Sequence, residues 1–247
     1  MPARLLALLL VAVTYASASD AQDRSGQARA RMVEDIAAMA RETGGETGRS
    51  RFADAVMAAM GKVPRHRFVS LAQQDFAYEN RPLPIGEGQT ISQPYIVALM
   101  TDLLDPKPGD RVLEVGTGSG YQAAVLAELV ARVYTIEIVE PLGKNAAKIL
   151  GELGYRNIEA RVGDGYGGWP QAAPFDAIVV TAAPPSVPQP LVDQLKPGGR
   201  MVIPVGGSLE VQQLLLVEKR PDGSAATRRT LPVRFVPLTR DRGNVAK

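Results

Sequence analysis

The chain has 247 residues, enough for one large hydrophobic core or at most two small ones, and its 45% hydrophobic and 22% charged content is that of a globular protein. A formal net charge of +2 is too small to draw the chain onto nucleic acid, and the absence of cysteine excludes disulfides, thiolate nucleophiles and cysteine-bound zinc. The one histidine, His66, excludes a histidine cluster and leaves any Ser-His-Asp triad dependent on that residue.

The first eighteen residues have the pattern of an export signal. Arg4 is followed by an apolar run over 5–13 and by "ASA" at 16–18, which together are typical of a cleaved signal peptide. The apolar run is too short to span a bilayer as a helix. Alternatively, translation starts at Met32, and the residues before it are not part of the protein. Between the two, residues 19–31 are polar and predict a disordered linker.

Residues 32–92 are expected to hold short helices and a substrate loop. Apolar residues at helical spacing predict helices over 32–42 and 51–63. His66 stands between two arginines, and we interpret it as structural rather than catalytic. The stretch "PLPIGEGQTISQP" at 82–94 then combines glycines, prolines and two hydroxyl side chains with a single charge, an unusual lead into an apolar helix.

From residue 93 onward, helical and strand-like patterns alternate. Apolar residues recur at helical spacing over 94–104, and uninterrupted runs such as "AIVV" and "MVI" are typical of parallel strands covered on both faces. We therefore predict a doubly wound α/β domain over 93–245, with a mostly parallel sheet and an antiparallel C-terminal edge. The expected elements are strands at 111–116, 132–138, 158–164, 175–183, 200–206, 211–220 and 227–238, and helices at 120–130, 141–154 and 188–195.

The segment "VLEVGTGSGY" places Gly116, Gly118 and Gly120 at the end of the first strand of this domain, where doubly wound sheets bind ligands. A dinucleotide fingerprint would need its third glycine at position 121, which is a tyrosine, so the spacing suits a nucleoside without a pyrophosphate. Glu137, at the end of the next strand, can accept hydrogen bonds from both ribose hydroxyls. Asp164, after the third strand, is placed to meet the adenine edge. Alternatively, the glycines form only a tight turn, and the two acids are solvated loop residues.

These segments resemble a known family. "VLEVGTGSGY", "IE", "GDG" and "FDAIVVTAA" resemble the S-adenosylmethionine sites of class I methyltransferases, and "LPIGEGQTISQP" with "VRFVPL" resembles the protein-L-isoaspartate(D-aspartate) O-methyltransferase family, over about residues 32–240. The resemblance implies methyl transfer from S-adenosylmethionine to the free α-carboxylate of isoaspartyl residues in damaged proteins, which starts repair through a succinimide. The cofactor contacts that it implies are Gly116, Thr117, Gly118, Gly120, Glu137, Asp164 and Gly165.

The same resemblance assigns Ser92, the serine of "TIS", as the active-site residue. A carboxylate with a pKa near ~4 is already ionised at neutral pH, so it needs alignment and desolvation rather than a base. Thr90 and Ser92 can donate hydrogen bonds to that carboxylate. Gly86 and Gly88 can let a substrate backbone lie close, and Ile85 can exclude water. Alternatively, Ser92 serves only as the N-cap of the helix that follows.

Other functions stay open on the sequence. A cytosine-C5 methyltransferase would need a cysteine nucleophile, and amino-methylating enzymes commonly carry Asp/Asn-Pro-Pro-Tyr/Phe where this chain has "TAAPPSVP". A small-molecule methyltransferase of the same fold and a non-catalytic protein that binds S-adenosylmethionine are further alternatives. We expect no metal, no nucleic-acid partner, no stable membrane association and a monomer.

The sequence offers two locations. The N-terminal pattern favours export to the periplasm, whereas S-adenosylmethionine is made in the cytosol and members of the family generally work there. We expect a cytoplasmic enzyme, with periplasmic export through residues 1–18 as the alternative.

Overall fold

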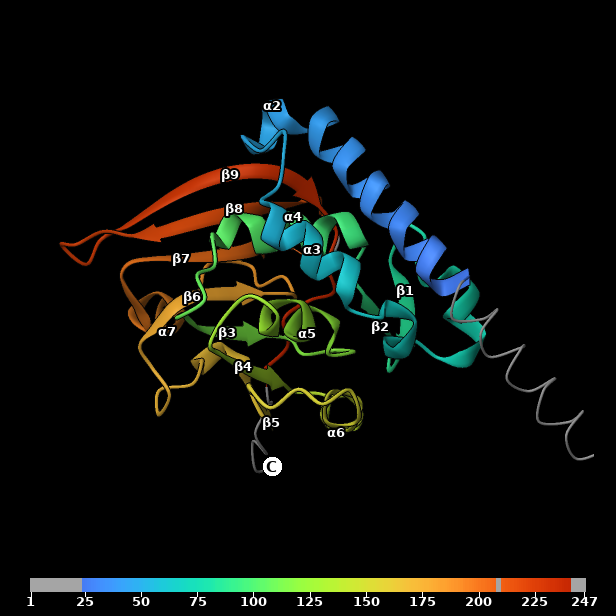
Figure 1. Ribbon diagram of the computed structural model, residues 1–247. Helices are drawn as coiled ribbons and strands as arrows, with labels where there is room; N and C mark the ends of the chain where they lie inside the picture. Colours follow the sequence, from blue (N-terminus) through green and yellow to red (C-terminus); the bar gives the residue numbers. More distant parts are fainter. Residues whose placement is uncertain (1–23, 208–209, 241–247) are drawn as a thin grey trace, which may run out of the picture.

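The computed structural model describes residues 24–207 and 210–240 (Figure 1). The expected signal segment at 1–18 lies outside these residues. Within them, no helix is long and apolar enough to cross a membrane. The centre of the molecule is a seven-stranded sheet in the order β5 (Ile158–Val162), β4 (Arg132–Glu137), β3 (Arg111–Val115), β6 (Phe175–Val180), β7 (Leu195–Val205), β8 (Gln212–Lys219) and β9 (Ala225–Val233).

The pairing of these strands confirms the predicted fold class. Strands β3 to β7 run parallel, and β8 and β9 add an antiparallel edge joined by the "PDG" turn. The helices of this domain are α4 (Pro94–Leu104), α5 (Tyr121–Ala127), α6 (Glu140–Glu152) and α7 (Gln189–Asp193). From β3 the chain adds strands toward β5 on one side, and from β6 it adds them toward β9 on the other. The loops that follow β3 and β6 therefore diverge from each other at one edge of the sheet.

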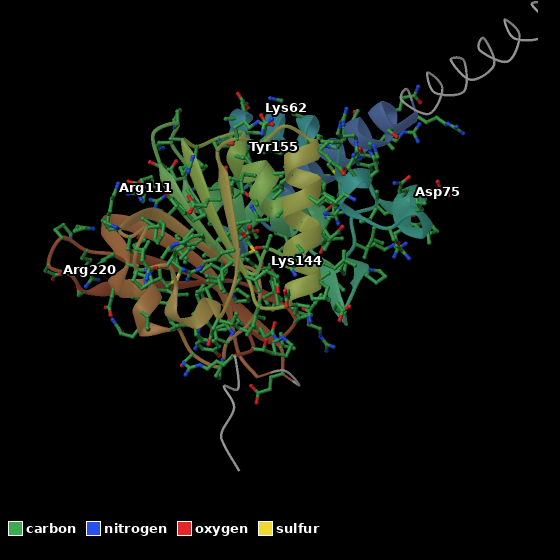
Figure 2. All side chains as sticks on the ribbon, turned by 90° about the horizontal axis from the view of Figure 1, so that it is seen from below. Lys62, Asp75, Arg111, Lys144, Tyr155 and Arg220 are labelled. Carbon is green, nitrogen blue, oxygen red and sulfur yellow. The ribbon has the colours of Figure 1, made fainter. Side chains whose placement is uncertain are left out.

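Two hydrophobic clusters cover the two faces of the sheet. Because successive side chains of a strand point to opposite faces, Val112 packs with α4 and α5 in one cluster, while its neighbour Leu113 packs with α7 in the other. Charged side chains lie at the periphery, as Figure 2 shows for Lys144 on α6 and for Arg220 at the turn between β8 and β9. The sheet is therefore buried on both faces, as its uninterrupted apolar runs predict.

The N-terminal region corrects one prediction. Residues 24–42 form a single helix (blue in Figure 1), so the disordered linker expected at 19–31 is wrong for 24–31. Ala28, Met32, Ile36 and Ala40 follow one another at intervals of four, and all four pack in the first cluster. The polar composition of this stretch concealed a helical row that begins at Ala28. The chain continues through α2 (Gly44–Thr47) and α3 (Asp54–Lys62) to the short 3-10 helices η1 (Arg65–Phe68) and η2 (Leu71–Phe76).

The expected substrate loop is a β-hairpin. Its strands β1 (Leu83–Gly86) and β2 (Gln89–Ile91) are antiparallel, with Leu83 opposite Ile91, and both of these side chains are buried in the first cluster. The turn places Glu87 and Gly88 at φ 53° and 69°, the left-handed pair that two-residue hairpin turns favour. The hairpin therefore holds Thr90 and Ser92 on a framework fixed by the core.

Candidate active site

The loop after β3 approaches the end of β6 very closely. A Cβ atom on Gly116 would lie 2.4 Å from Oγ1 of Thr181, and the φ of Gly116 is 99°, a value that side chains rarely allow. The Thr181 hydroxyl donates a hydrogen bond of 2.5 Å to the Gly116 carbonyl. Glycine at 116 is thus required both by the turn and by the contact with Thr181.

Glu137 is tied to this loop. It is 6% exposed, its Oε2 accepts from the Gly118 amide at 2.7 Å, and its Oε1 accepts from the Val139 amide at 2.9 Å. The alternative of a solvated loop acid is therefore wrong for Glu137. Two backbone amides hold the carboxylate at the end of β4, beside the glycines, as a nucleoside site would require.

A cavity opens at the carboxyl ends of β3, β4 and β6, and we call it the glycine-loop cavity. Its wall also includes the hairpin and the segment after β9, where Leu238 and Thr239 lie. The Leu238 amide donates to the Ala183 carbonyl at 2.9 Å, which fixes that segment across the end of β6. The predicted residues that line this cavity are Thr90, Ser92, Gly116, Thr117, Gly118, Glu137 and Gly165.

Two predicted cofactor residues lie off this cavity wall. Asp164 accepts from the Tyr166 amide at 2.8 Å and so caps the short 3-10 helix η3 (Gly165–Gly167). A Cβ on Gly120 would lie 3.3 Å from Ala146 and Leu150, so this glycine lets α5 pack closely on α6. The structure assigns both residues a local structural contact.

A second, mostly apolar cavity adjoins the first, and we call it the apolar cavity. Thr90, Ser92 and Thr181 line both cavities and form the wall between them. The remaining lining comes from the N-terminal helix, the residue before β1, the start of α4, the loop before β8, and the end of β9 with the two residues after it. Those residues are Met39, Pro82, Gln93, Tyr95, Ile96, Val211, Leu231, Pro232, Val233, Arg234 and Phe235.

Ser92 is not a helix cap. The N-cap of α4 is Gln93, and neither its side chain nor that of Ser92 makes a capping hydrogen bond. Within residues 24–207 and 210–240, the Ser92 hydroxyl has no hydrogen-bond partner, and the residue is half-buried. Its hydroxyl is therefore free to bind a ligand at the wall between the two cavities.

The other hairpin residues lie nearer the tip. Ile85 reaches the glycine loop, since its Cδ1 lies 3.5 Å from where a Cβ on Gly118 would stand. Gly86 and Gly88 form the exposed turn, both with positive φ, and line neither cavity. His66 also lies off both cavities, with its Nδ1 2.7 Å from the Tyr78 hydroxyl, in keeping with a structural role.

Glu114 is a buried acid on the cavity wall that sequence analysis missed. Its side chain is fully buried in β3, and Thr135 donates to its Oε2 at 2.5 Å. A second contact of 2.5 Å joins the hydroxyls of Thr135 and Thr117, so a chain of hydrogen bonds links the acid to the glycine loop. Burial, reinforced by the charge of Glu137, raises the pKa of Glu114 to about 8. The sequence did contain a signal for this residue, because Glu114 is an acid inside the largely apolar strand "RVLEV".

This raised pKa predicts a pH-dependent stability. The proton is bound more tightly in the folded protein than in the unfolded chain, where the pKa is near 4.5, so the free energy of unfolding should fall as pH rises from 4.5 to 8. Relative to Glu114→Gln, the loss should reach at most about 5 kcal/mol. Urea denaturation between pH 5 and 8 measures it, with the exposed Glu34→Gln as control. If the difference in free energy of unfolding between wild type and Glu114→Gln stays constant over this range, the pKa of Glu114 is not raised.

Comparisons with known proteins show the family of this chain. The family model described as protein-L-isoaspartate(D-aspartate) O-methyltransferase matches residues 46–243. Protein-L-isoaspartate O-methyltransferase 1 of Cupriavidus necator is 60% identical over 240 residues, which cover 96% of this chain and 93% of that protein. Protein-L-isoaspartate O-methyltransferase 2 of Polaromonas sp. is 64% identical over 211 residues, which cover 85% of this chain and 100% of that protein.

Solved structures of similar fold were also found. A protein-L-isoaspartate O-methyltransferase superimposes with a TM-score of 0.74 at 29% identity, covering 86% of this chain and 67% of the solved one. A Plasmodium falciparum protein solved with S-adenosyl-L-homocysteine superimposes with a TM-score of 0.71, covering 85% and 98% of the two chains; at 24% identity it shows the fold alone. This chain belongs to the protein-L-isoaspartate(D-aspartate) O-methyltransferase family.

Proposed function

We propose that this protein transfers a methyl group from S-adenosylmethionine to the free α-carboxylate of L-isoaspartyl residues in damaged proteins and peptides. The observation that carries the proposal is the wall shared by the two cavities, where Thr90, Ser92 and Thr181 face both. A donor in one cavity and an acceptor in the other would meet at these hydroxyls. The family membership supports the same activity.

The glycine-loop cavity fits a nucleoside cofactor. Its polar groups include the buried Glu137 carboxylate and the backbone of Gly116, Thr117 and Gly118, and Gly165 also lines it. In this proposal Glu137 accepts hydrogen bonds from the ribose hydroxyls, and Gly165 borders the base. Asp164, next in the chain, would reach the adenine edge only if its side chain turned away from the cap of η3. S-adenosylmethionine supplies an electrophilic methyl group on its sulfonium.

The acceptor side needs no general base. The isoaspartyl α-carboxylate is ionised at neutral pH, with an ordinary pKa near ~4, and so carries its own nucleophilic oxygen. Thr90 and Ser92 donate hydrogen bonds that orient it, and the apolar cavity removes water from around it. Ile85, Gly86 and Gly88 border the approach of the substrate backbone. The ester product has a better leaving group than the acid, so the next backbone nitrogen closes a succinimide, which hydrolyses in part to normal aspartate.

The substrate prediction compares two peptides. In an isoaspartyl linkage the free carboxylate sits one atom nearer the backbone than in normal aspartate, and a misplacement of about 1 Å can lower the rate about a hundredfold. We therefore expect methylation of an isoaspartyl peptide and negligible turnover of its aspartyl counterpart, measured with radiolabelled S-adenosylmethionine. Equal rates on the two peptides would contradict the substrate, and no turnover of either would favour a non-catalytic binding protein.

Ser92→Ala tests the hydroxyl at the shared wall. The change should lower kcat on the isoaspartyl peptide by about tenfold or more, since one hydrogen bond to a charged group is lost. The affinity for S-adenosylmethionine should stay near the wild-type value, because in this proposal the Ser92 hydroxyl binds the acceptor carboxylate and Glu137 binds the cofactor. Ser70→Ala, at an exposed serine without a capping bond, is the control. A fully active Ser92→Ala enzyme would remove Ser92 from the reaction.

Glu137→Gln tests the cofactor assignment. Losing the charged acceptor should weaken S-adenosylmethionine binding by about 1.5–3 kcal/mol, roughly a tenfold to hundredfold rise in Kd. Isothermal titration calorimetry measures this, with the exposed Glu140→Gln on α6 as the control, and thermal denaturation checks that the loop still folds. An unchanged Kd would show that the ribose contact lies elsewhere.

We further propose that the enzyme acts as a monomer in the cytoplasm, since one chain lines both cavities and the cytosol is where S-adenosylmethionine is made. Export to the periplasm through residues 1–18 is the alternative. Fusing residues 1–25 to a reporter that is active only outside the cytoplasm separates the two. An active reporter would overturn the cytoplasmic proposal, and sedimentation of the purified protein checks the monomer.

A further inference from the structure

Arg65 is a buried cation away from both cavities. It opens η1 and is 0% exposed, whereas Arg67, two residues later, is exposed and pairs with Glu152 at 3.3 Å. In the described parts of the chain, Arg65 takes part in none of the ion pairs. Burial lowers its pKa to about 10, so it stays charged at neutral pH. Burying a charge without a counterion is costly, so its other contacts must compensate.

Those contacts are two carbonyl oxygens and an aromatic ring, while the buried Nη1 has no hydrogen-bond partner among the described residues. Arg65 Nε donates to the Ala77 carbonyl at 2.8 Å, and its Nη2 donates to the Ser92 carbonyl at 2.8 Å. The guanidinium carbon lies 4.8 Å from the centroid of the Tyr121 ring, a cation–π distance. Tyr121 lines the glycine-loop cavity and begins α5, while Ser92 lies on the wall between the cavities. One planar group therefore touches both the acceptor side and the cofactor side of the site.

The contact with Ser92 fixes the direction of its side chain. Because the peptide group is planar, holding the carbonyl oxygen orients the plane between Ser92 and Gln93. Two residues on, Pro94 begins α4 with its φ set by the ring. On the other side, Ile91 is held in β2 and buried. With the backbone held on both sides, the Cα–Cβ bond of Ser92 has one direction, which limits its unpaired hydroxyl to the few staggered positions about that bond.

We propose that Arg65 is a positioning residue for methyl transfer, which holds the backbone that carries the Ser92 hydroxyl and sets its Cα–Cβ direction relative to the cofactor side without itself touching either substrate. The proposal rests on the role of Ser92 proposed above. A lysine at 65 would keep the charge, but it cannot hold two carbonyls in a planar fork beside the Tyr121 ring, because its ammonium is a point charge on a flexible stem.

The test combines Arg65→Lys with Ser92→Ala on isoaspartyl peptide and S-adenosylmethionine. Arg65→Lys should lower kcat about tenfold to a hundredfold, as expected for a displaced hydroxyl. Its Kd for S-adenosylmethionine and its KM for the peptide should stay within about threefold of wild type. When Ser92→Ala is already present, adding Arg65→Lys should change kcat by less than about twofold. Arg67→Lys, at the exposed neighbour, should leave kcat unchanged.

Three other results would contradict the positioning role of Arg65. An equal loss with and without the Ser92 hydroxyl would show that Arg65 acts independently of it. A matching loss of cofactor affinity or of thermal stability would make Arg65 a folding residue; Arg65→Met is the second variant, and failure of both variants to fold has the same meaning. Full activity of Ser92→Ala alone would instead refute the role proposed for Ser92, and the inference about Arg65 would fall with it.

Discussion

The site depends on the close approach of Gly116 to Thr181. Strand β3 lies between β4 and β6, and the loop that leaves it must pass the end of β6 with no side chain between them. Thr181 both holds the loop through the Gly116 carbonyl and lines the two cavities. Any side chain at 116 would push Thr181 away and change both cavities together. The relative position of the two cavities is therefore set by one contact within the fold.

Three buried ionisable groups also lie at or near the two cavities. Glu137 is held by backbone amides and Glu114 by a threonine hydroxyl, while Arg65 donates to carbonyl oxygens. Each is fixed by uncharged polar groups of the chain, so its position does not depend on a mobile counterion on the surface. Dipoles fixed in this way need little reorganisation when a reaction occurs, and they act more strongly where water is excluded. A site that lacks a base can still align its reactants by this means.

The sequence predicted best where local pattern and tertiary packing agree. The helix at 94–104 is observed with the same bounds, because its apolar row faces the sheet and Pro94 fixes its start. Glu137 was found because the end of a strand places an acid beside the glycines. The same spacing did not predict that Asp164 caps η3 or that Gly120 packs against α6, since it locates a strand end or a turn but not the direction in which a residue faces.

The sequence did not assign individual roles to residues that long-range packing brings to the site, even where it singled out the segments that contain them. The hairpin has no alternating pattern, and its strands form because Leu83 and Ile91 reach the core. Thr181 and Leu238 line the glycine-loop cavity only once β6 and the segment after β9 meet at the sheet edge. Arg65 gave no sequence signal either, since one arginine of "RHR" reads like the other until burial separates them.

The most direct measurement is a crystal structure of the protein with S-adenosyl-L-homocysteine and an isoaspartyl peptide. We expect the nucleoside to lie in the glycine-loop cavity beside Glu137. We also expect the α-carboxylate oxygens to lie within about 2.6–3.2 Å of the Thr90 and Ser92 hydroxyls. A carboxylate that contacts neither hydroxyl, or a peptide bound away from the wall between the two cavities, would contradict it.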